Sequence, residues 1–374
     1  MAPERVLIIG GGFAGLSAAI AFRQRGVVVT LVEIAADCGA YGAGISIGGA
    51  TLRALKQLGV LDAYFEHGFG CEATEIRDAH DRLIQMIPAP RLAGADVPGN
   101  GAVMRPVLAH ILHDAAVAAG ADVRLSTTVT ALRDEGGAVA TTLSDGSSGR
   151  YDLVVGADGL LSQTRALLFP DAPAPRYNGQ SVWRAVLPKL AQVNHTMLWV
   201  GETSKVGLNP VSRDEMYLFV NENRPNRDRL PDDALVDGLK ALLEPYAAPL
   251  VQQARGMIGP ESQIVFRPLD GLLMPLPWHK GRVVLIGDAV HATTPHLASG
   301  AGIGIEDAIV LAEELVAAPD IATGFEGFER RRWERCRMVV HNSGRLGEIE
   351  VTGGDKAEHA RLMETSFRTL AEAI

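Results

Sequence analysis

A glycine-rich turn near the amino terminus constrains the fold more than any other feature of the sequence. Residues 5–9 read RVLII, a continuous apolar run that is typical of a parallel strand buried on both faces. The run leads directly into GGGFAG at residues 10–15, which satisfies the pattern GxGxxG, and an alanine-rich helical stretch then extends from residue 16 to residue 25. Strand, glycine turn and helix in this order predict the opening of a dinucleotide-binding βαβ unit.

Each glycine of the turn has a distinct expected role at a pyrophosphate. Gly10 permits the tight turn, Gly12 lets backbone amides come close to the phosphates, and Gly15 lets the helix pack against the strand. Phe13 and Ala14 lie at the helix amino terminus, which supplies positive partial charge. We therefore expect the phosphates of a nucleotide to lie over this turn.

A carboxylate follows the turn at the spacing that dinucleotide folds use. The apolar run at residues 27–32 ends in Glu33, about twenty residues after the motif. Its carboxylate can accept hydrogen bonds from both hydroxyls of an adenosine ribose, and it would repel a 2′-phosphate. These residues favour FAD or NAD over NADP as the tightly held nucleotide, and the turn by itself does not separate FAD from NAD.

The composition argues against nucleic acid and membranes as partners. The chain has 374 residues, of which 47% are hydrophobic, so it can bury a large core, and its formal charge of -9 gives no net field that would attract nucleic acid. No apolar run approaches the roughly 18 residues of a membrane span, and three cysteines without a CxxC pair suit a reducing compartment. We expect a cytoplasmic monomer or homodimer that acts on small molecules, without a metal site and without nucleic-acid or membrane partners.

Two later segments repeat the order of strand, Gly/Asp turn and helix. In the first, an apolar strand ends at Asp158-Gly159, and a helix follows. In the second, an apolar strand ends at Gly287-Asp288, and a loop that begins near Pro295 leads into a helix. An aspartate in one such turn is ordinary turn chemistry, but two of them added to an amino-terminal nucleotide turn favour FAD.

As a set, these motifs resemble those of the FAD-dependent aromatic hydroxylases, the single-component flavoprotein monooxygenases. The likeness covers most of the chain and is greatest to the oxygenases of 3-hydroxypyridine carboxylic acids and to salicylate hydroxylase-like enzymes. It implies an α/β protein with an FAD-binding dinucleotide fold of the para-hydroxybenzoate hydroxylase type and an interleaved antiparallel-sheet substrate domain. The implied boundaries are 1–72, 98–175 and 276–374 for the FAD-binding domain, and 73–97 and 176–275 for the substrate domain.

The same resemblance implies which further residues contact FAD. Asp288 would meet the ribityl chain, Arg105 would contact the cofactor, and the backbone of Val129 would hold the adenine. The loop from Pro295 to Gly302 would pass beside the isoalloxazine ring, although this stretch lacks the asparagine that many members carry. The remaining expected cofactor contacts are Gly44, Asp158, Gly300, Ala301 and Gly302.

The residues between the second and third motifs read as short strands. An antiparallel sheet is predicted over residues 180–220, with a hairpin at 77–87 added to it, and this sheet would form a roof over the flavin. Arg184, Lys205 and Tyr217 match in place residues that pyridine-carboxylate oxygenases use around their substrate, and a cation pair would favour a carboxylate or phenolate. Alternation along a strand leaves open whether each of them faces the flavin or the outer surface.

The resemblance implies an oxygen-dependent reaction in which FAD carries the difficult chemistry. NADH or NADPH would reduce FAD as a transient co-substrate, and O2 would add to give a flavin C4a-hydroperoxide that hydroxylates a small aromatic or heteroaromatic acid or phenol. The expected catalytic residues are Pro295, Arg184, Tyr217 and Lys205. Two alternatives stay open at this point: a flavin oxidase or dehydrogenase of the same fold, and a non-catalytic NAD-binding sensor.

Overall fold

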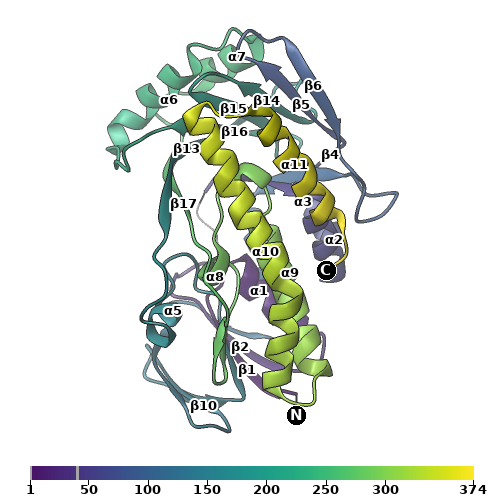
Figure 1. The fold of residues 1–374 in the computed structure, drawn as a ribbon, viewed down its shortest axis with the longest axis vertical. Coiled ribbons are helices and arrows are strands. Elements are labelled where there is room, and N and C mark those ends of the chain that lie inside the picture. Colours follow the sequence, from purple (N-terminus) through teal and green to yellow (C-terminus); the bar gives the residue numbers. More distant parts are fainter. Residues whose placement is uncertain (1, 39–41) are drawn as a thin grey trace.

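The protein is elongated and has a sheet at each end. The computed structural model describes residues 2–38 and 42–374. Strands β1 and β2 and helix α1 (Phe13–Arg23) lie at one end of the long axis, and strands β13 to β16 lie at the other (Figure 1). Helix α10 (Ile321–Thr352) runs along this axis and contacts elements of both ends.

The sheet at the amino-terminal end has six strands in the order β18-β19-β12-β1-β2-β8. All of its pairings are parallel except that of β18 with β19. Val6 and Ile8 pack into one core cluster and Leu7 and Ile9 into another, so β1 is buried on both faces as its apolar run predicted. The strands are β1 (Arg5–Ile9), β2 (Val28–Val32), β8 (Asp122–Arg124), β12 (Leu153–Gly156), β18 (His279–Lys280) and β19 (Val283–Leu285).

Helices and a second sheet cover the two faces of this parallel sheet. Helices α1, α4 (Arg105–Ala118) and α9 (Gly300–Ala317) share the larger core cluster. The smaller cluster lies beneath an antiparallel sheet of three strands, β9 (Val129–Asp134), β10 (Val139–Leu143) and β11 (Ser148–Tyr151). Two short helices, α5 (Gln163–Leu168) and α8 (Asp288–His291), follow strands β12 and β19.

A small antiparallel sheet lies between the two ends of the molecule. Its order is β3-β7-β4, with β3 (Gly44–Gly48), β7 (Asn100–Met104) and β4 (Phe69–Cys71), and it leads into helices α2 (Gly49–Gln57) and α3 (Leu61–His67). The sequence does not predict this sheet, because strands of three to five residues are too short to show a clear period.

The sheet at the other end has seven strands in the order β17-β13-β16-β15-β14-β5-β6. One face carries a core cluster that includes Trp183, Trp199 and Leu218, and helices α6 (Leu235–Leu243) and α7 (Pro249–Met257) cover it. The predicted hairpin at 77–87 is present as β5 and β6, at one edge of the sheet. The strands are β5 (Ala73–Asp78), β6 (Leu83–Pro88), β13 (Arg176–Pro188), β14 (Thr196–Val200), β15 (Ser204–Pro210), β16 (Glu215–Asn223) and β17 (Ile264–Gly271).

The carboxy-terminal part of the chain consists of two helices. Helix α10 ends at Gly353, which adopts a φ of 66°, and α11 (Lys356–Ala371) begins after Asp355. A left-handed residue at this position favours glycine, so the break is encoded locally. Helix α1 begins at Phe13 rather than at residue 16, because Gly12 already takes the extended conformation of a helix N-cap.

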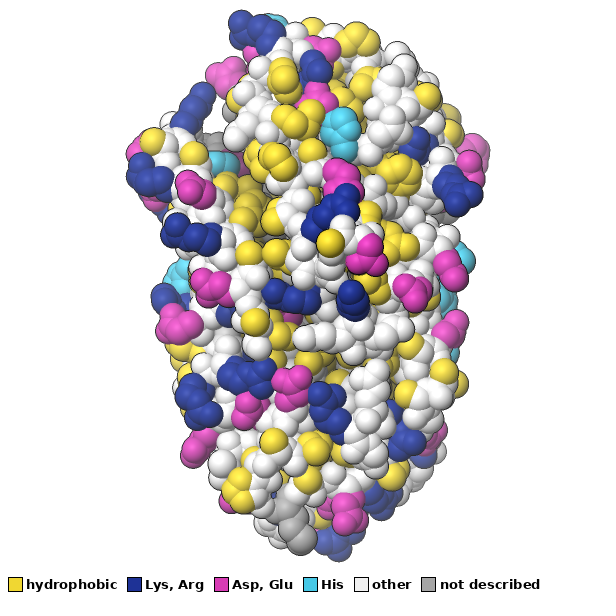
Figure 2. All heavy atoms as spheres, turned by 90° about the vertical axis from the view of Figure 1, so that its right-hand side faces the viewer, with side chains coloured by type: hydrophobic (Ala, Val, Ile, Leu, Met, Phe, Trp, Pro, Cys, Tyr) yellow, Lys and Arg dark blue, Asp and Glu magenta, His cyan; other side chains and the backbone are white. Residues whose placement is uncertain are grey.

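The surface carries charges of both signs. Figure 2 shows acidic and basic side chains interspersed over one long face of the molecule. Among the described residues, no helix is long and apolar enough to cross a membrane.

Candidate active site

The glycine turn forms a cradle over the amino terminus of α1. Gly10 has a φ of 108°, and a side chain there would overlap the backbone carbonyl of Ala157. A side chain at Gly15 would overlap the carbonyl of Gly10, whereas one at Gly12 would meet no atom within 4 Å. Gly10 and Gly15 therefore allow close packing, and Gly12 borders open space in front of the helix amino terminus, where an anionic group is favoured.

Glu33 is held in place at the end of β2. Its Oε2 accepts a hydrogen bond from the Gly11 amide at 2.6 Å, and its Oε1 accepts one from the Ala35 amide at 2.8 Å. The Glu33 carbonyl in turn accepts from the Thr127 amide, which brings the segment before Val129 to the same strand end. The carboxylate is thus oriented over the glycine turn with acceptor capacity that remains for a ligand.

The Asp158 turn is organised around helix α5. The Asp158 Oδ2 accepts hydrogen bonds from the Thr164 amide and hydroxyl, both at 2.9 Å, and Oδ1 accepts from the Ser162 hydroxyl. Arg165 donates to the carbonyls of Leu160 and Ala289, each at 2.8 Å, and so joins this turn to the turn at Gly287-Asp288. The Asp158 side chain thus has a local capping role, and its contact with the cofactor stays a prediction.

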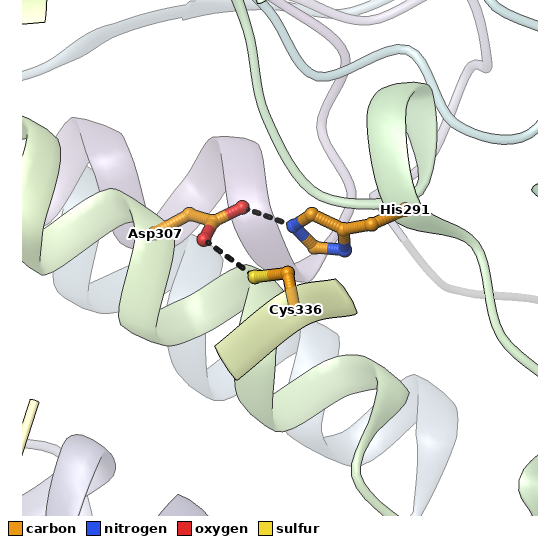
Figure 3. A group of neighbouring side chains, drawn as sticks. All are labelled: His291, Asp307 and Cys336. Carbon is orange, nitrogen blue, oxygen red and sulfur yellow. Dashed lines mark hydrogen bonds and ion pairs between the residues drawn. The ribbon is translucent and has the colours of Figure 1, made fainter. Parts of the chain in front are cut away.

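A buried carboxylate holds the Gly287-Asp288 turn. Asp307 on α9 accepts from the Gly287 amide at 3.0 Å, from His291 Nε2 at 2.5 Å and from Arg332 Nε at 2.8 Å. Figure 3 shows the His291 ring and the Cys336 thiol, each facing a different oxygen of this carboxylate. Burial disfavours the charge on Asp307, but His291 and Arg332 hold its pKa at about 2. Because Asp307 stays ionised, it fixes the backbone from which the Asp288 side chain projects.

This cluster does not suit a metal ion. His291, Asp307 and Cys336 offer ligand atoms within 4.8 Å of one another. However, the guanidinium of Arg332 is fully buried beside Asp307 and also lies 3.6 Å from the Cys336 sulfur. A divalent cation would meet a fixed positive charge at very short range in a poorly screened site. The group is therefore best described as a buried ionic support for the Gly287-Asp288 turn.

Asp288 is accessible to solvent but has charged protein groups close to it. The protein around its side chain displaces much of the bulk water. This desolvation raises the pKa of Asp288, against the opposing charges of His291 and Arg105. Arg105 at the start of α4 is half-buried, and burial together with the charge of Arg184 lowers its pKa. Its guanidinium lies 5.7 Å from the centre of the Phe13 ring at the glycine turn. A solvent-accessible carboxylate enclosed by protein fits a position in a ligand cavity.

The three candidate substrate residues share one face of the seven-stranded sheet. Residues paired across antiparallel strands point to the same side. Arg184 pairs with Phe219, Asn209 with Tyr217 and Lys205 with Asn221. The core cluster under α6 and α7 occupies the opposite face, so the side with Arg184, Lys205 and Tyr217 is turned toward the first sheet. We call this face the roof.

The roof closes onto the small sheet at Gly44. A side chain at Gly44 would overlap the ring of Tyr217, and Asn209 donates to the Ser46 hydroxyl at 2.6 Å. Arg184 Nε donates to the Tyr217 hydroxyl at 3.0 Å. Gly44 therefore permits a close approach, and Arg184, Tyr217 and Arg105 meet where the roof, β3 and α4 come together.

Lys205 reaches a different part of the molecule. Its Nζ lies 2.8 Å from Oε1 of Glu350 on α10. The Oε2 of Glu350 lies 3.4 Å from Nε2 of His296, which follows Pro295 in the short helix η2 (Pro295–Leu297). The Pro295 loop continues through Ala298, with a φ of 48°, into the amino terminus of α9, where Gly300, Ala301 and Gly302 lie.

Sequence reasoning did not single out His296, Glu350 or Asp307. His296 could have been found, because it is a titratable residue directly after Pro295 in a loop that was already expected beside the flavin. Glu350 is distant in sequence from Lys205, and no motif connects the two. Their contact depends on how α10 crosses the ends of β13 and β15.

Comparisons with known proteins agree with this arrangement. The profile of a family described as an FAD-binding domain matches residues 4–322. The chain is 32% identical over 355 residues to 2-heptyl-3-hydroxy-4(1H)-quinolone synthase of Pseudomonas aeruginosa, covering 92% of this chain and 90% of that protein. It is 31% identical over 357 residues to 3-hydroxybenzoate 6-hydroxylase of Polaromonas naphthalenivorans, covering 92% and 87%. The crystal structure of Klebsiella pneumoniae HpxO with FAD and uric acid superposes with a TM-score of 0.82 at 26% identity, covering 99% of this chain and 93% of that one.

Proposed function

Because the chain belongs to the family of FAD-dependent aromatic hydroxylases, we propose that this FAD-dependent monooxygenase hydroxylates a small aromatic acid or phenol held by Arg184 and Tyr217. The overall reaction would convert the aromatic C–H group, O2, NAD(P)H and a proton into the phenol, NAD(P)+ and water. One observation carries the proposal. Arg105 and Arg184 approach each other between the two sheets, and neither forms an ion pair within the described ranges 2–38 and 42–374.

The residues present fit FAD, and each has a separable role toward it. The open space over Gly12 would receive the pyrophosphate, and Glu33 would bind the adenosine ribose. Asp288 would contact the ribityl chain and Arg105 the flavin end of the cofactor. Bound FAD supplies the redox chemistry, with electrons from NADH or NADPH and O2 as the oxidant.

The protein's own part is to position the ring and to exclude water. The Arg184 guanidinium would orient an anionic oxygen of the substrate, because it is a charged donor that has no carboxylate partner among the described residues and donates to the Tyr217 hydroxyl. The roof and the loop from Pro295 to Gly302 would enclose the reacting ring from two sides, which limits side reactions with water. We further propose that 73–97 and 176–275 form the substrate domain, and that a cytoplasmic monomer or homodimer is the active form.

The test is the substitution Arg184→Ala. We expect at least a tenfold loss in affinity for the aromatic substrate, about the effect of losing one charge-assisted hydrogen bond, with FAD content unchanged. Affinity is measured by titration of the flavin absorbance of the purified protein. Arg213→Ala is the matched control, because Arg213 is exposed on the turn between β15 and β16. Unchanged substrate affinity in Arg184→Ala would remove Arg184 from the site.

Two other functions would give distinct results in the same assay. A flavin oxidase or dehydrogenase would be reduced by its substrate without any pyridine nucleotide. A non-catalytic NAD-binding sensor would purify without flavin and would bind NAD in its place.

A further inference from the structure

The charge of Lys205 is already matched inside the protein. Lys205 and Glu350 each expose only 20% of the side chain, and their charged atoms are 2.8 Å apart. Two more groups fix Glu350 in this position: Gln180 donates to Oε2 at 3.2 Å, and Asn223 donates to the Glu350 backbone carbonyl at 2.9 Å. The pair is therefore built into the junction of α10 with the roof.

Within the described residues, Lys205 is the Lys or Arg side chain that pairs with Glu350. The nearby titratable groups are His296 on η2 and His359 on α11, at 3.4 Å and 3.3 Å. Burial lowers the pKa of His296, which keeps its ring neutral at neutral pH despite the opposing effect of Glu350. Burial also opposes the charge on Glu350, but Lys205 and the two histidines hold the pKa of Glu350 well below its usual range. The carboxylate stays ionised, and Lys205 is its principal counter-charge.

The two ends of the roof consequently differ in charge. At one end, Arg184 and Tyr217 present a cation without a carboxylate partner in the part of the chain that the structure describes. At the other end, Lys205 and Glu350 cancel. The same end presents a neutral polar atom that lacks a hydrogen-bond partner among the described residues, the Asn221 side-chain oxygen. Such an acceptor suits an uncharged donor group of a ligand and not a second anion.

We propose that Glu350 is a specificity-determining residue: it neutralises Lys205, so that the site takes an aromatic ring with a single anionic group at Arg184 and discriminates against dianions. This inference rests on the proposed function, because it describes the substrate class of the same site. A second carboxylate on the ring would approach Glu350 and lose its hydration without a free cation to replace it.

The test compares benzoate, with one carboxylate, and isophthalate, with two, by calorimetric titration of the FAD-loaded protein at neutral pH. Wild-type protein should bind benzoate at least about tenfold more tightly than isophthalate. Glu350→Gln should raise the affinity for isophthalate by about tenfold and leave the affinity for benzoate within about twofold, because it releases the Lys205 ammonium. Adding Lys205→Met to Glu350→Gln should abolish the gain.

Glu348→Gln is the matched control, because Glu348 lies on the exposed side of the same helix and pairs with Arg345. A wild-type protein that binds isophthalate as tightly as benzoate, or that does not bind benzoate, would overturn the inference even if Glu350→Gln failed to fold. The inference would also be overturned if Glu350→Gln showed no gain in affinity for isophthalate, or if the variant with both Glu350→Gln and Lys205→Met kept that gain. These binding results do not depend on hydroxylation. If the protein binds FAD and benzoate but forms no oxygenated product, the proposed function fails, and the binding data still test whether Glu350 neutralises Lys205.

Discussion

At the scale of single residues, Asp307 has the largest predicted effect on stability. It is fully buried and joins Gly287, His291 and Arg332. Asp307→Asn would leave the Arg332 charge with Glu306 alone and would remove the carboxylate that faces the buried His291 ring. Removing one member of a buried pair costs about 3–5 kcal/mol. We expect a loss of this order in the free energy of unfolding, measured by urea denaturation, together with partial loss of FAD. The exposed substitution Glu334→Gln on α10 should stay within about 0.5 kcal/mol of wild type.

The same residue sets a pH dependence with a defined sign. The pKa of Asp307 is about 2 in the folded protein, below its ordinary value of about 4. A lowered folded pKa means that the stabilisation is present above about pH 4 and is lost as the pH falls toward 2. Wild-type protein should therefore lose more stability across this window than Asp307→Asn. Equal slopes for the two proteins would contradict the ionised state of Asp307.

At the scale of elements, a substitution at the amino terminus of α1 should weaken cofactor binding without disturbing the fold. A methyl group at Gly12 would meet no protein atom, but it would enter the space in front of the helix amides. Gly12→Ala should fold with nearly the thermal midpoint of flavin-depleted wild type and should bind FAD at least tenfold more weakly, measured by fluorescence titration. Gly256→Ala in α7 is the control, because a side chain there also meets open space, far from the turn in sequence. Normal FAD affinity in Gly12→Ala would contradict the assignment of this turn to the pyrophosphate.

The elements also show what a sequence alone can predict. β1 and the glycine turn were predicted, because a continuous apolar run and a GxGxxG spacing are local signals. The roof strands were placed approximately, although β13 begins at Arg176, before the predicted start of the sheet at residue 180. The face on which Arg184, Lys205 and Tyr217 lie could not be predicted, because it depends on strand register and on the helices that cover the other side. The Lys205 and Glu350 pair depends on the path of α10 through the whole molecule.

At the scale of the whole molecule, the parallel sheet, the roof and α10 make one site out of segments that are far apart in the sequence. Arg105, Arg184 and Asp288 approach one another from α4, β13 and α8. No single segment carries the candidate site, and the proposed enclosure of a ring between the sheets would depend on all of them. Membership of the FAD-dependent monooxygenases rests on the FAD-binding-domain match over residues 4–322 together with relatives that are 31% and 32% identical.

The most direct test of the central claim is an isotope experiment on the purified holoenzyme with NADH or NADPH, ¹⁸O₂ and a panel of hydroxylated benzoates and phenols. A monooxygenase transfers one atom of dioxygen to its product, so mass spectrometry should detect a hydroxylated ring that carries one labelled oxygen, formed only when pyridine nucleotide is present. An unlabelled product, or substrate oxidation that proceeds without pyridine nucleotide, would contradict oxygen transfer and would indicate an oxidase or dehydrogenase.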